Sequence, residues 1–120
     1  MMWVKKLTDC EEFTAGDGCT LREYLHPARG DFALRYSLAH ATVPERQTTQ
    51  AHTLKTSEVY VILSGRGIMH IDDESHRIEA EDVIYIPPGA VQYLENISKG
   101  TLRFLCIVDP AWRKEDETIL

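Results

Sequence analysis

The residues best suited to chemistry lie in two short segments of the sequence. His52 and Glu58 stand in the first segment, and Gln92 lies in the second, within 91–96. An imidazole and a carboxyl group can act as general acid and base near neutral pH. With a carboxamide oxygen, the same groups could instead bind Zn²⁺, Mn²⁺ or Fe²⁺ and leave positions open for water or a substrate. The predicted catalytic residues are His52 and Glu58, and the predicted metal ligands are these two and Gln92.

Strand periodicity decides which neighbours share a face with this pair. Alternate residues of a strand point to the same side. His52 would therefore share its face with Gln50 and Leu54, and Glu58 would share its face with Tyr60. Two registers are open, one with the Gln50–His52 pair at the site and one with His52 and Leu54. Gln50 and Tyr60 are predicted substrate contacts, although a tyrosine at such a position can equally belong to the core.

One charged residue interrupts an alternating segment at 31–43. Arg35 lies on the face opposite to the apolar positions Phe32, Leu34, Tyr36 and Leu38. The alternation predicts a long strand over 31–43. The guanidinium of Arg35 could bind a carboxylate or phosphate of a substrate, or it could lie on a solvated surface.

The rest of the chain is dominated by the same period of two. Residues 20–25 also favour a strand over a helix. Turn-forming residues separate the predicted strands, which are 58–64, 68–71, 77–79, 82–86, 91–95 and 101–108. About ten short strands in so short a chain predict an all-β sandwich or small barrel. The exception is a short C-terminal helix over 111–117, predicted because Asp109-Pro110 forms a good cap and first turn.

The first segment resembles one of the two sequence motifs of the cupin superfamily, G(X)5HXH(X)3–4E(X)6G. His52, Glu58 and Gly65 occupy motif positions at the required spacing. Leu54 stands where the motif has its second histidine, and Arg46 stands where it has the leading glycine.

The second segment resembles the other cupin motif, G(X)5PXG(X)2H(X)3N. Pro87, Gly89 and Asn96 match it, whereas Gln92 replaces the histidine and Glu81 replaces the leading glycine. Two motifs that agree with the strand pattern indicate the fold, but the superfamily contains isomerases, dioxygenases, decarboxylases, storage proteins and sensors, so they do not indicate one function.

The resemblance implies a double-stranded β-helix, or jelly-roll, barrel over 32–108. We expect a single domain, 1–120, with N-terminal strands in 1–31 and a tail at 109–120. In cupins the motif residues face the barrel lumen, which implies that one divalent metal could be held there.

The chemistry implied is of the isomerase or lyase type, on a sugar-like or acid-like small molecule. The same acid–base pair would serve without a metal, as in some sugar epimerases of this fold. The alternative is a non-catalytic binding module that senses a metabolite or a metal.

Composition excludes some classes of partner. The 120 residues carry a net charge of −6, which argues against nucleic acid and against an anionic membrane surface. No apolar run is long enough for a membrane span, and the N-terminus lacks the apolar region of a signal peptide. The three cysteines show no paired spacing and are expected to be reduced. These features predict a cytoplasmic protein.

Two predicted strands are apolar on both faces. Segments 58–64 and 102–108 have apolar residues at nearly every position, and the chain has almost no helix to cover a second face. We therefore expect a homodimer that packs sheet faces together.

Overall fold

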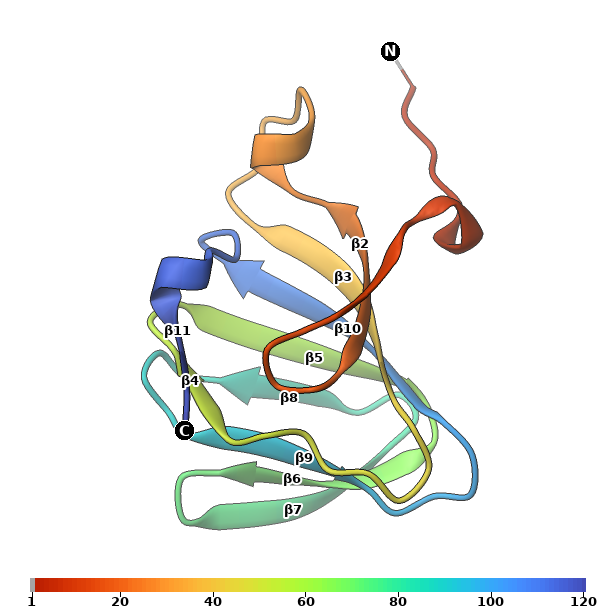
Figure 1. Ribbon diagram of the computed structural model, residues 1–120, viewed down its shortest axis with the longest axis vertical. Coiled ribbons are helices and arrows are strands. Elements are labelled where there is room, and N and C mark those ends of the chain that lie inside the picture. Colours follow the sequence, from red (N-terminus) through yellow and green to blue (C-terminus); the bar gives the residue numbers. More distant parts are fainter. Residues whose placement is uncertain (1) are drawn as a thin grey trace.

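Alternating apolar and polar residues form two β-sheets that face each other and enclose a barrel (Figure 1). The structure is a computed structural model and describes residues 2–120. The six-stranded sheet consists, in spatial order, of β1 (Glu12–Thr14), β2 (Thr20–Leu25), β3 (Ser37–Val43), β10 (Leu102–Asp109), β5 (Ser57–Ser64) and β8 (Val83–Ile86). The five-stranded sheet consists of β11 (Glu117–Ile119), β4 (His52–Leu54), β9 (Gln92–Asn96), β6 (Arg66–Ile71) and β7 (Glu74–Glu79).

Over the residues that the structure describes, helical structure is limited to three short 3-10 turns, which are η1 (Leu7–Asp9), η2 (Pro27–Arg29) and η3 (Lys114–Asp116). Within residues 2–120 no helix has the length and apolar character that a bilayer crossing requires. The all-β prediction is confirmed, and so are the strand over 20–25 and the six strands predicted after residue 57, within a few residues at their ends.

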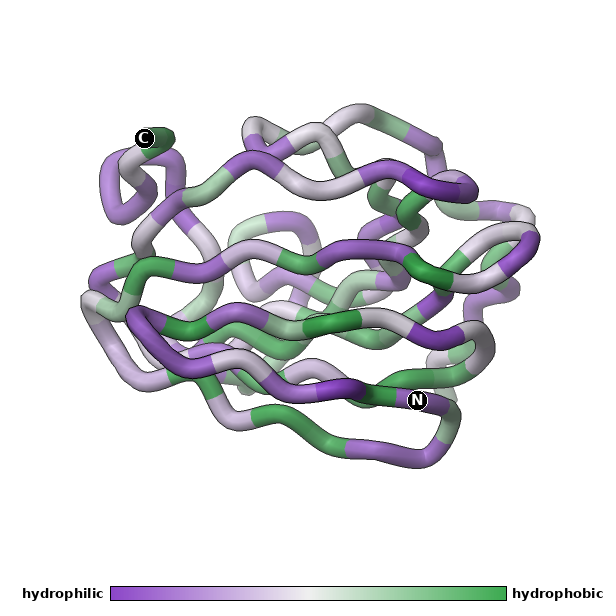
Figure 2. The backbone as a smooth tube through the Cα atoms, turned by 90° about the horizontal axis from the view of Figure 1, so that it is seen from below, coloured by the Kyte–Doolittle hydropathy of each residue, from purple (hydrophilic) through white to green (hydrophobic). Residues whose placement is uncertain are grey.

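The core lies between the two sheets. Along β5 the buried side chains alternate with half-buried ones, and Glu58, Tyr60 and Ile62 point inwards. Figure 2 shows the resulting alternation of hydrophobic and hydrophilic residues along the strands. Phe104 on the neighbouring β10 is 1% exposed, and its ring lies 4.5 Å from that of Tyr60. Glu58 and Tyr60 thus occupy the end of an otherwise apolar interior.

The strand predicted over 31–43 begins only at Ser37. Residues 31–36 instead form the connection that follows η2. In this connection Phe32 packs edge to face against Trp3, and the carbonyl of Arg35 accepts a hydrogen bond from the backbone N–H of Ala111 at 2.7 Å. Residues 31–36 therefore make tertiary contacts and do not pair with a strand of the sheet.

The predicted C-terminal helix over 111–117 is wrong. The segment forms the single turn η3 and then the strand β11, which pairs antiparallel with β4. Backbone N–H groups of Lys55 and Leu120 donate to the carbonyls of Asp116 and Ala51, each at 3.0 Å. Because β4 would otherwise leave one edge without partners, pairing with β11 satisfies backbone groups that a helix would leave free.

Candidate functional site

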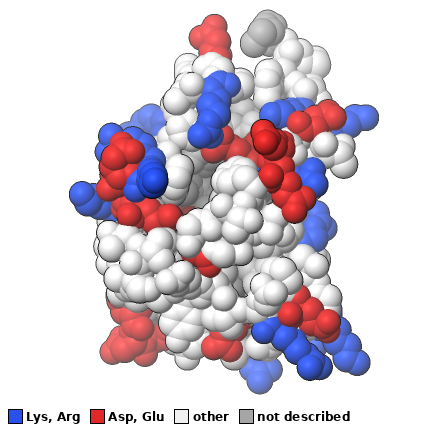
Figure 3. Space-filling view, in the orientation of Figure 1, with Lys and Arg blue, Asp and Glu red and all other residues white. Residues whose placement is uncertain are grey.

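A cavity of about 240 Å³ lies inside the barrel. Side chains of β2, β3, β4, β5 and β10 point into it, and the β1–β2 turn and Trp112 border it. Figure 3 shows the molecule hollowed on this face, with acidic side chains on both sides of the hollow. The cavity combines apolar walls with a few convergent polar groups, as small-molecule sites generally do.

His52 and Glu58 border this cavity together, from opposite sheets. They are 3% and 5% exposed. The Nδ1 atom of His52 lies 3.1 Å from the carbonyl oxygen of Gln50. A neutral ring satisfies that carbonyl by donating from Nδ1–H, and this assigns the lone pair to Nε2. In that tautomer, the Nε2 of His52 can accept a proton.

Glu58 is only partly satisfied by hydrogen bonds. Its Oε2 accepts from the thiol of Cys106 at 2.7 Å, whereas its Oε1 is buried with no partner among the described residues. Burial raises the pKa of Glu58, and the Cys106 thiol, the Gln92 amide and His52 oppose this rise. The buried carboxyl is thus shifted towards its protonated form, in which it can donate a proton.

Tyr60 and Gln92 form a buried hydrogen bond with each other. The Tyr60 hydroxyl donates to Gln92 Oε1 at 3.0 Å, and burial is the main cause that raises the pKa of Tyr60. Tyr60 borders the cavity, but Gln92, which is 1% exposed, does not. The structure therefore brings together four of the predicted site residues, which are His52, Glu58, Tyr60 and Gln92.

Two predicted substrate contacts lie elsewhere. Gln50 is exposed, and its Nε2 donates to the carbonyl of Leu120 at 3.0 Å. The side chain of Arg35 is 80% exposed and lies 3.5 Å from Asp109. Neither residue borders the cavity, whereas Leu54 does, so the register that faces the lumen is that of His52 and Leu54.

The N-terminal turn contributes a residue that the sequence did not single out. Asp17 is 7% exposed, and its Oδ2 lies 3.9 Å from His52 Nδ1. Its Oδ1 accepts a hydrogen bond from the backbone N–H of Cys19 at 3.0 Å. Its backbone carbonyl accepts a hydrogen bond from the backbone N–H of Gln50 at 2.7 Å. The one available signal was the turn sequence Gly16-Asp17-Gly18, which marks a tight turn but not its destination.

The C-terminal segment contributes two more cavity residues, Trp112 and Glu117. The indole Nε1–H of Trp112 donates to Glu117 Oε2 at 3.4 Å. Sequence reasoning did not find Glu117, because the pairing of β11 with β4 leaves no pattern in the local sequence.

The donor set does not fit the predicted metal centre. Gln92 Oε1 is occupied by the Tyr60 hydroxyl, and Leu54 presents methyl groups at the second histidine position. In the described part of the chain, no three His, Cys, Asp or Glu side chains converge closely enough to hold an ion. His52 and Glu58 alone leave a closed zinc-type site two ligands short.

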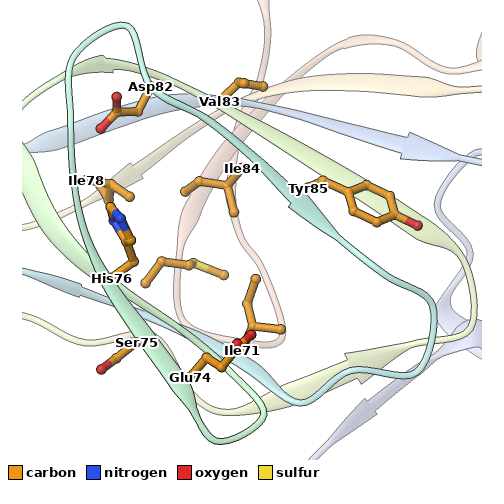
Figure 4. A pocket seen from close by; sticks show the side chains of 10 residues that line it. Ile71, Glu74, Ser75, His76, Ile78, Asp82, Val83, Ile84 and Tyr85 are labelled. Atoms are coloured by element: carbon orange, nitrogen blue, oxygen red, sulfur yellow. The ribbon is translucent and has the colours of Figure 1, made fainter.

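A second hollow, of about 460 Å³, lies between β7 and β8 (Figure 4). These are edge strands of different sheets and do not pair with each other. Ile78 and Ile84 form part of its wall, with His76 and Asp82 beside them. His76 Nδ1 lies within hydrogen-bond distance of the carbonyl of Arg77, and Asp82 accepts from the N–H of Glu79 at 2.8 Å. These two polar groups serve the local backbone.

Comparison with known proteins identifies relatives of this chain. The family model described as "Cupin domain" matches residues 39–108. The uncharacterized protein MJ1618 of Methanocaldococcus jannaschii is 42% identical over 107 residues, which are 87% of this chain and 83% of that protein.

Two solved structures show the same fold. A variant of Streptomyces PAC13 with uridine aligns over 100% of this chain and 92% of its own, with a TM-score of 0.80 and 22% identity. A predicted oxalate decarboxylase from Thermotoga maritima aligns over 90% and 99%, with a TM-score of 0.76 and 21% identity. At these identities the likeness concerns the fold alone.

Proposed function

The chain belongs to the cupin family, and we propose that it is an enzyme that performs acid–base chemistry on a small molecule in the barrel lumen. One observation carries the proposal: His52 and Glu58 are both buried and both border one cavity, and the Oε1 of Glu58 has no hydrogen-bond partner among the described residues. Buried imidazole and carboxyl groups in one pocket are typical of catalytic proton transfer.

The chemistry follows from the two protonation states. Nε2 of His52 would remove a proton from a carbon of the substrate, and the electron pair of that C–H bond would form a double bond. In a dehydration, the protonated carboxyl of Glu58 would give its proton to the departing hydroxyl, which leaves as water. In an isomerisation, the proton would be returned to a different atom. Neither route needs a metal, and both are of the lyase or isomerase type.

A structural relative gives limited support to this class of reaction. Pac13 is described as a nucleoside dehydratase, and it has been solved with uridine. Loss of water from a small hydroxylated molecule is a reaction that an imidazole and a neutral carboxyl can perform together.

We also propose that the protein is a homodimer. The outer face of the six-stranded sheet places apolar side chains side by side on adjacent strands, namely Val59, Val61, Val83, Tyr85, Leu105 and Ile107. Val83 and Tyr85 are 68% and 62% exposed. An apolar sheet face of this kind is suited to packing against a second copy.

The catalytic proposal is tested by turnover. Wild-type protein is incubated with a panel of hydroxylated carbonyl compounds, sugars and nucleosides, including uridine, and loss of water or isomerisation is followed by NMR. We expect turnover that falls by about 100-fold or more in His52→Gln and in Glu58→Gln, and that is unchanged in the control Glu74→Gln at the other hollow. Saturable binding without turnover would contradict the proposal and favour the non-catalytic module.

A further inference from the structure

The wall of the lumen cavity carries four carboxyl groups, and none of the described residues that border it is Lys or Arg. Glu23 lies nearest to a basic side chain, because it forms an ion pair with Arg29. The other three, Asp17, Glu58 and Glu117, accept hydrogen bonds from neutral thiol, backbone and indole donors. Among the described residues that border the cavity, His52 is the only one whose side chain can become positive, and its Nδ1 lies 3.9 Å from Asp17 Oδ2.

Their electrostatic effects converge inside the cavity. Burial is the largest cause that raises the pKa of the Cys19 thiol, and Asp17, Glu58 and Glu117 each raise it further. Three carboxyl groups from three separate parts of the chain therefore act on one point of the wall. A carboxylate or phosphate that entered this space would meet repulsion with no basic side chain to offset it.

Glu58 supplies an independent indication of a ligand. It is 5% exposed, it borders the cavity, and its Oε1 is buried with no hydrogen-bond partner in residues 2–120. A buried carboxyl oxygen of this kind loses its interaction with water and gains nothing in return, unless a bound molecule supplies a hydrogen-bonding partner.

The remaining walls suit an organic body. Leu54, Phe104 and Trp112 border the same cavity and supply aliphatic and aromatic surface. Aromatic faces attract organic cations, and apolar surface favours the carbon skeleton that carries the charge. A bare metal ion would gain nothing from these walls, and the described residues offer it no three-ligand cluster.

We propose that the ligand of this cavity is a small organic cation, such as a compound with a protonated amine, whose charge is balanced by Asp17 and Glu117 while Glu58 Oε1 supplies a hydrogen-bonding partner. The inference rests on the proposed small-molecule site in the lumen and names its substrate class. It disfavours the acid-like substrates that the sequence suggested, and with them an anion-binding role for Arg35, which lies outside the cavity.

The test compares three probes that share one ring and differ in charge: cyclohexylammonium, cyclohexanol and cyclohexanecarboxylate. The protein has two tryptophans, so a Trp3→Phe variant leaves Trp112 on the cavity wall as the sole indole reporter. We expect cyclohexylammonium to change its fluorescence saturably and to bind at least about tenfold more tightly than cyclohexanol. Cyclohexanecarboxylate should bind more weakly than either.

Neutralising variants locate the effect. Asp17→Asn and Glu117→Gln should each reduce the preference for the cation over the alcohol by about threefold or more, while Glu74→Gln at the other hollow should leave it unchanged. The proposal is overturned if cyclohexanecarboxylate binds as tightly as cyclohexylammonium, or if no cationic probe binds. It is also overturned if Glu74→Gln alone removes the preference for the cation. A further contradicting result would be that Zn²⁺ or Mn²⁺ alone reproduces the fluorescence response with the same dependence on the variants. Because the readout is binding, failure here leaves the turnover test of His52 and Glu58 intact.

Discussion

Glu58 is a single residue whose burial lowers the stability of the fold while it places a carboxyl group in the cavity. A carboxyl group that is 5% exposed has one thiol donor and one oxygen without a partner. Burial of an ionised carboxylate with so few partners opposes folding. Residues that are unfavourable for stability in this way are concentrated at functional sites.

This imbalance predicts a stabilising substitution. The folded-state pKa of Glu58 is raised above its ordinary value of 4.5, so its contribution to stability is fully present below that value and is lost as the pH rises through the folded-state pKa. Glu58→Gln, which cannot ionise, should therefore raise the Tm at neutral and alkaline pH and have little effect near pH 4. Thermal unfolding followed by circular dichroism across this range measures the effect. An equal or lower Tm at alkaline pH would show that the carboxylate is well accommodated.

Individual site residues differed in how far the sequence could predict them. His52 and Glu58 were predicted because they match positions of the first cupin motif, whose residues face the lumen in cupins, and both border the cavity. Gln50 and Arg35 were not placed correctly, because residues just outside a strand do not continue its alternation. Asp17 could not be predicted from local pattern, since its proximity to His52 depends on where a turn folds over the barrel.

At the scale of elements, the motif residues that match the cupin pattern shape turns that position the strands. Gly65 has a φ of 93°, and a Cβ there would lie 3.0 Å from the Cα of Leu102. Asn96, at the end of β9, donates from Nδ2 to the carbonyls of Val43, Pro44 and Gly100, and accepts from Ser98. Four motif positions are replaced: Leu54 and Gln92 stand at positions that the resemblance assigns to metal binding, and Arg46 and Glu81 stand at glycine positions.

Asn96 is accordingly predicted to be structural. Asn96→Ala removes the donor to three backbone carbonyls in a residue that is 3% exposed, so it should lower the free energy of unfolding by about 2–4 kcal/mol. Urea denaturation measures this loss. The control is Asn96→Asp, which keeps the acceptor for Ser98 but not the donor and should also destabilise. A loss below about 0.5 kcal/mol in Asn96→Ala would contradict the assignment.

Elements were predictable where a strand is long and alternates, and less so near the termini. The segment 111–117 has good local signals for a helix. Its last residue nevertheless begins the strand β11, which pairs with the edge of β4. Local propensity is a weak determinant when a neighbouring edge offers backbone hydrogen bonds. Because this pairing could not be predicted from local propensity, Glu117 was not among the predicted site residues.

At the scale of the whole molecule, the outer face of the six-stranded sheet places exposed and half-buried apolar side chains on three adjacent strands. Val61 lies at its centre, opposite Leu105 on one side and Val83 on the other. The sequence predicted two-sided apolar strands, and the structure covers only their inner faces.

We expect wild-type protein to be a dimer at micromolar concentration and Val61→Lys to be a folded monomer, because a lysine would place a charge in the centre of the packed face. Size-exclusion chromatography with light scattering measures both. Ile97→Lys, at a surface position 39% exposed and outside the strands, serves as the control and should remain a dimer. A monomeric wild type would contradict the proposed assembly.

The central claim is that His52 and Glu58 perform acid–base chemistry without a metal, and one measurement tests it most directly. The turnover rate of wild-type protein is measured with its best substrate before and after exhaustive chelation, with residual metal quantified by elemental analysis, and His52→Gln is measured alongside. We predict that the stripped wild type retains its full rate and that His52→Gln loses about 100-fold or more. A rate that disappears on chelation and returns with Zn²⁺, Mn²⁺ or Fe²⁺ would contradict the account.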